Sequence, residues 1–109
     1  MTHAMPSQAA LEADIGRTFT LTIPDVLCVG VRLAAVHAGT PMNRRYCCYS
    51  AEFAAPPGAQ LPQALYEVAC GDQCWPLLLT PIGPGEDGQP RLEAVFHYLI
   101  PELAMQAAG

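Results

Sequence analysis

The feature that most constrains the fold is a series of short segments in which apolar and polar residues alternate. In residues 18–23, Phe19, Leu21 and Ile23 alternate with three threonines. Successive side chains of a β-strand point to opposite faces of its sheet, so this pattern predicts a strand with one buried face and one face in water. The same alternation recurs in residues 27–33, 47–53, 66–70 and 92–98.

Residues 75–82 differ from the other segments because both faces of this predicted strand are apolar. Such a strand is either covered on both sides or presents an apolar face to a partner. Pro76 and Pro81 lack the N–H group that a sheet ladder needs, which places them at strand ends, at bulges or on an edge strand. We therefore interpret this segment as a candidate edge strand.

Turn residues connect the segments at short and regular intervals. Gly71 and Asp72 predict a tight hairpin, and residues 83–90 are rich in glycine and proline. Ser7 is a suitable N-cap for a short helix that ends before Gly16. Together these signals predict a mainly β fold, an antiparallel six-stranded small barrel with a short N-terminal helix. A two-sheet β-sandwich is the alternative.

The length of 109 residues predicts one domain, residues 1–109. We divide it into a mobile N-terminal arm (1–6), the short helix (7–15), the β domain (17–99) and a C-terminal tail (100–109). Pro101 suits the first position of a helical turn in that tail.

Three motifs of this chain, residues 61–68, 80–88 and 92–96, read LPQALYEV, TPIGPGEDG and LEAVF. They resemble an uncharacterised family of small bacterial all-β proteins, a domain of unknown function whose members carry LPQGTYRL-, VPVGPDxxG- and YEAVF-like motifs in the same order. Ala64 departs from that pattern, since the family usually has glycine there. The resemblance implies no activity or cofactor. Some members look as if they belong with phage-tail-like genes, which implies a structural or assembly role.

Composition narrows the choice of partners. The chain has five Lys+Arg against ten Asp+Glu, so nucleic acid and anionic membranes are not expected to bind. Charged residues make up 14%, against about 25% in an ordinary domain. We infer that some apolar surface is hidden in a homo-oligomer, in the first instance a dimer, or against another protein. A bias of composition towards Ala, Gly and Pro is the competing explanation.

A cytoplasmic location is expected from three features. No apolar run is long enough to cross a membrane, residues 1–8 lack the features of a signal peptide, and five cysteines is an odd number, which suits reduced thiols.

The sequence does not identify a biochemical function, but it supports three hypotheses. The first is a non-enzymatic protein-interaction or assembly module. The candidate contact residues of this module are apolar residues of the predicted strand and of its neighbour: Trp75, Leu77, Leu78, Leu79 and Val95.

The second hypothesis is a small barrel that binds an apolar ligand in its interior or mouth. Its candidate lining residues are aromatic: Tyr49, Phe53, Tyr66 and Phe96. The competing interpretation is that these side chains simply fill the barrel.

The third hypothesis, ranked last, is a thiol- or metal-dependent enzyme. Cys70 and Cys74 could approach each other across the predicted hairpin, as metal ligands together with His97 or as a reversible disulfide. A zinc site needs four ligands, however, and free cysteine is a common small core residue. We therefore expect no metal, no cofactor and no catalytic residues.

Overall fold

The computed structural model describes residues 6–40 and 46–99. Within them, one short helix, α1 (Gln8–Ala13), precedes six strands. The strands are β1 (Thr18–Ile23), β2 (Leu27–Ala38), β3 (Tyr46–Ala54), β4 (Ala64–Cys70), β5 (Gln73–Pro84) and β6 (Pro90–Leu99). The predicted tail with its helical turn, and the arm before Pro6, lie outside the described residues.

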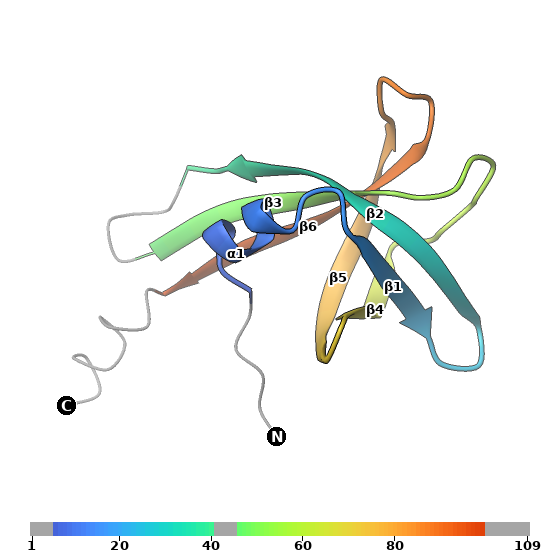
Figure 1. Cartoon of the computed structure of the whole chain (residues 1–109), viewed down its shortest axis with the longest axis horizontal. Helices are drawn as coiled ribbons and strands as arrows, with labels where there is room; N and C mark the ends of the chain where they lie inside the picture. The colour runs from blue at the N-terminus through green and yellow to red at the C-terminus, as the bar shows by residue number, and fades with distance from the viewer. Residues whose placement is uncertain (1–5, 41–45, 100–109) are drawn as a thin grey trace.

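The six strands form one closed antiparallel barrel in the order β1-β2-β3-β6-β5-β4. This result confirms the predicted barrel and removes the need for the sandwich alternative. Figure 1 shows that the barrel divides into two parts, one with β1 and β4 and the other with β3, β6 and α1. The long strand β2 joins both parts, since its first half pairs with β1 and its second half with β3. The two ladders meet at Arg32, and a register shift between Leu33 and Ala35 follows within the β2–β3 ladder.

The core consists of the inward-facing residues of all six strands. Leu21, Leu33, Tyr66, Val68 and Leu79 are completely buried, and the described part of the chain has no buried polar or charged residue. The Tyr66 hydroxyl donates a hydrogen bond to the carbonyl of Pro62 over 2.6 Å, which satisfies its polar end. Burial of this ring raises the pKa of Tyr66.

Helix α1 packs on β2 and β3 (Figure 1). As predicted, Ser7 is the N-cap, and its hydroxyl accepts a hydrogen bond from the Ala10 amide over 3.0 Å. A helix of six residues is marginal alone, so it depends on tertiary packing. Leu11 supplies that packing by burying its side chain in the core, and the Tyr49 hydroxyl donates to the carbonyl of Pro6.

The prediction that residues 75–82 form an edge strand is wrong, because β5 pairs with β4 on one side and with β6 on the other. The register explains how β5 tolerates Pro76. The two-residue turn makes Cys70 and Gln73 a hydrogen-bonded pair, and hydrogen-bonded pairs alternate along an antiparallel ladder. By this alternation, the nitrogen of Pro76 points away from β4. It points towards β6, whose ladder with β5 begins only at Thr80.

The same alternation explains Pro81. Thr80 bonds towards β6, so the nitrogen of Pro81 points back towards β4. The ladder between β4 and β5 has already ended at Leu79. Each proline therefore faces the side of β5 where pairing is absent, and neither costs a ladder hydrogen bond.

Two adjacent leucines of β5 test which side chains of this strand point into the barrel and which point to solvent. We expect Leu79→Ala to lower the free energy of unfolding by about 2–5 kcal/mol, because the side chain is fully buried. Leu78→Ala is the matched control, and its effect should stay within about 0.5 kcal/mol because Leu78 is exposed. Urea unfolding of both variants measures the difference, and equal effects would contradict the register.

Candidate functional site

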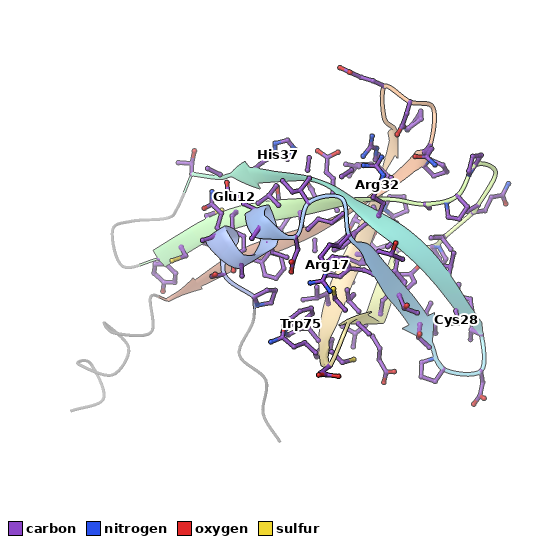
Figure 2. The ribbon with its side chains drawn as sticks, viewed as in Figure 1. Glu12, Arg17, Cys28, Arg32, His37 and Trp75 are labelled. Carbon is purple, nitrogen blue, oxygen red and sulfur yellow. The ribbon has the colours of Figure 1, made fainter. Side chains whose placement is uncertain are left out.

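Three of the residues predicted to form a contact surface lie inside the barrel. Trp75 is only 4% exposed, and Leu77 and Leu79 are also buried. Figure 2 shows Trp75 near the β4–β5 turn. The assignment of these three residues to an exposed patch is therefore wrong. The physical reason is closure of the barrel, which takes one complete face of β5 into the core.

The other two predicted contact residues are exposed. Leu78 is 55% exposed and Val95 is 64% exposed. Leu65 on β4, which the sequence reasoning missed, is 63% exposed and pairs directly with Leu78. Thr80 and Glu93 are the first pair of the β5–β6 ladder. Leu78 and Val95 each lie two residues from this pair, so each shares the outer face of its strand with the paired residue. We call Leu65, Leu78 and Val95 the outer apolar row.

A signal in the sequence could have located Leu65. The two-residue turn at Gly71 and Asp72 fixes the register of the β4–β5 hairpin. Counting back from the turn places Leu65 opposite Leu78, on the outer face of the same hairpin.

Two carboxylates border the outer apolar row. Glu67 lies two residues from Leu65 on β4, and Glu93 lies two residues from Val95 on β6. Side chains two residues apart on a strand share a face, so both carboxylates belong to the outer face of the barrel. The row is thus an apolar strip with acidic neighbours.

The four aromatic residues predicted to line a ligand pocket pack against other core side chains. The rings of Tyr49 and Phe96 stack with centroids 4.7 Å apart, and Phe53 meets Phe19 edge-on at 5.3 Å. Tyr66 is also fully buried. This packing supports the interpretation that these side chains fill the barrel.

The cysteine pair at the hairpin does not converge. Cys70 pairs with Gln73, and Cys74 pairs with Ala69 on the next rung of the ladder. Successive rungs point to opposite faces, so Cys70 is buried whereas Cys74 is exposed. Across residues 6–40 and 46–99, no cluster of three or more His, Cys, Asp or Glu side chains could hold a metal ion. His97 instead lies beside the ring of Tyr46, with centroids 5.2 Å apart.

The loop between β5 and β6 is fixed by an exposed carboxylate. Asp87 forms salt bridges with Arg32 over 3.3 Å and with Arg91 over 3.2 Å. It also accepts a hydrogen bond from the Gln89 amide over 2.9 Å. This amide, followed by the two guanidinium groups, lowers the pKa of Asp87. Figure 2 labels Arg32 on β2, close to this loop. The contacts tie the hairpin tip to a strand 55 residues earlier.

Gly85 lies directly against the side chain of Arg91. A Cβ atom placed there would lie 2.2 Å from the Nε of Arg91, so any larger residue would require the guanidinium group to shift. The loop backbone therefore rests directly against the guanidinium group.

A surface groove of about 240 Å³ opens beside this loop. It lies between the loop that joins β3 to β4 and the base of the β5–β6 hairpin. Its lining is uncharged except for one arginine and consists of Ala59, Gln60, Leu61, Pro81, Gly83, Pro84, Pro90, Arg91 and Leu92. None of the predicted pocket aromatics is among these residues.

The geometry defines a small six-stranded antiparallel barrel domain with an outer apolar row and a groove at one end. A family model described as a domain of unknown function, DUF6916, matches residues 6–96. The chain therefore belongs to this family, which agrees with the sequence-based resemblance to a family of unknown function. No significant match was found among curated proteins or among solved structures. In the part of the chain that the structure describes, no helix is long and apolar enough to cross a membrane.

We expect Asp87→Asn to destabilise the protein at neutral pH and to have less effect in acid. Because the pKa of Asp87 is lowered in the folded state, its stabilisation is present above the unfolded pKa. That stabilisation is lost as the pH falls through the folded pKa. Urea unfolding at pH 7 and below about pH 3 measures the convergence of the two proteins.

The control for this experiment is Glu86→Gln, which removes one charge from the same loop and leaves the contacts of Asp87 in place. A destabilisation by Asp87→Asn that is equal at both pH values would contradict the electrostatic origin of the effect.

Proposed function

We propose that this domain is a non-enzymatic protein-interaction module that associates with itself through the outer apolar row, in the first instance as a dimer. One observation carries the proposal. Three aliphatic side chains on three consecutive barrel strands, Leu65, Leu78 and Val95, are each more than half exposed. Leu65 and Leu78 are direct cross-strand partners, and Val95 lies on β6, two residues from the pair Thr80 and Glu93 that begins the β5–β6 ladder. Contiguous apolar surface of this kind typically marks an interaction site.

The expected strength of this association follows from the size of the row. Complete burial of an aliphatic side chain contributes about 1.5–3 kcal/mol, so these half-exposed side chains contribute roughly half of that each. Six of them, three from each copy, give about 5–9 kcal/mol. Association costs an estimated 4–15 kcal/mol of lost freedom. We therefore expect a weak dimer that depends on concentration, unless further contacts surround the row.

One more exposed apolar side chain lies on β5. Ile82, further along β5, is 44% exposed. It lies at the register shift between Pro81 and Gly83, where the strand leaves the regular ladder. Repeated contacts between copies would suit the assembly role that follows if this chain, like some members of the family it resembles, belongs with phage-tail-like genes. All five cysteines are free thiols, and we include a cytoplasmic location in the proposal on that basis.

The experiment compares two exposed aliphatic residues at different places. Leu78→Ser should shift sedimentation equilibrium towards monomer, because it puts a hydroxyl in the middle of the row. Val26→Ser is the matched control, since Val26 is 70% exposed but lies at the β1–β2 turn, outside the row. The proteins would be compared from about 5 to about 500 µM, the range that reveals weak association.

Two results would contradict the proposal. One is a wild-type protein that is monomeric throughout this range. The other is a dimer that survives Leu78→Ser but dissociates with Val26→Ser.

A further inference from the structure

The groove exists because pairing of β5 changes sides along its length. The ladder between β4 and β5 ends at the pair Ala64 and Leu79, but β5 continues for five residues to Pro84. No strand pairs with this last part of β5 on the β4 side within the described residues. Residues 59–61 of the preceding loop lie across the gap instead, and the groove is the space between them.

The walls of the groove are rigid and apolar. Pro81, Pro84 and Pro90 line it, and their rings fix the backbone angle φ, so the groove is largely formed before any ligand binds. Leu61 and Leu92 add aliphatic surface. Its volume of about 240 Å³ is below the usual range for drug-sized ligands, about 300–1,000 Å³. The groove therefore suits a small molecule with a short hydrocarbon portion.

Arg91 is the charged residue of the groove and has unused hydrogen-bonding capacity. Its side chain is 13% exposed, and its Nη2 atom contacts Asp87. Its Nε atom is buried without a hydrogen-bond partner. A guanidinium group has five N–H donors, and a poorly satisfied cation in an apolar setting favours an additional anion.

The acidic residues near Arg91 do not satisfy its preference for an additional anion inside the groove. Asp87 divides its contacts between Arg91 and Arg32, so two cations share one carboxylate. Glu86 is the next acid in the loop and is exposed, and Glu93 lies two residues along β6. Neither of these two acids lines the groove.

We propose that the groove binds a small apolar carboxylic acid. In this arrangement the hydrocarbon portion packs against the prolines, Leu61 and Leu92, and the carboxylate accepts hydrogen bonds from the guanidinium group of Arg91. The site is separate from the outer apolar row and does not depend on self-association.

Hexanoate is the probe, and amide chemical shifts report where it binds. Titration to about 20 mM should shift the amides of Leu61, Gly83 and Leu92 and leave that of Val26 unchanged. Hexanol, which has the same chain length without the charge, should bind more weakly at these residues, and acetate should not bind. The titration is performed on the Leu78→Ser variant, so that self-association does not alter the spectra.

Substitutions at the groove rim test the role of charge without removing Arg91, which also holds the loop. Gln60→Glu should weaken hexanoate binding about fivefold and Gln60→Lys should strengthen it, because each places a charge near the carboxylate. Neither should change hexanol binding. Gln63→Glu is the matched control, since Gln63 is an exposed residue of the same loop that does not line the groove.

Any of three results would overturn the proposal. Hexanol could bind as tightly as hexanoate, Gln63→Glu could weaken binding as much as Gln60→Glu, or the groove amides could remain unchanged. A positive result with a monomeric wild-type protein would support the groove and remove the proposed self-association, so the two proposals fail separately.

Discussion

The structure depends on the pairing of β5, which closes the barrel by using a different neighbour at each end. Its first half bonds to β4 and its second half bonds to β6. Pro76 and Pro81 are the residues that interrupt bonding, each on the side where no strand is paired. The prolines are therefore compatible with this change of neighbour, because neither occupies a position where a ladder needs its N–H group.

This change of partner produces both of the surfaces that we consider functional. Where β5 still pairs with β4, its outer face aligns Leu78 with Leu65. Where the β4 ladder has ended, the groove forms beside Pro81 and Pro84. One strand thus connects the apolar row, for which we propose self-association, with the concave site, for which we propose a small-molecule ligand.

Local alternation was sufficient to predict five of the six strands, because burial of one face leaves a period of two in the sequence, and the cap at Ser7 predicted the helix. It was insufficient for Trp75, since both faces of that strand are apolar and no polar residue indicates which side is wet. Barrel closure decides this question, and closure is a property of the whole chain. The groove could not be predicted either, because residues 59–61 of one loop form it together with Pro81 and Pro84 of β5, and no local pattern shows that these segments meet.

The distribution of charge limits how the outer apolar row can work. Each of the three arginines that the structure describes contacts a carboxylate, Arg17 with Asp14, and Arg32 and Arg91 with Asp87. Those contacts use the described cations close to the helix and the loop, while acidic residues border the row. Two copies that meet through the row therefore bring like charges together, and this repulsion opposes the gain from apolar burial. The self-association that we propose is for this reason a reversible contact and not an obligate dimer.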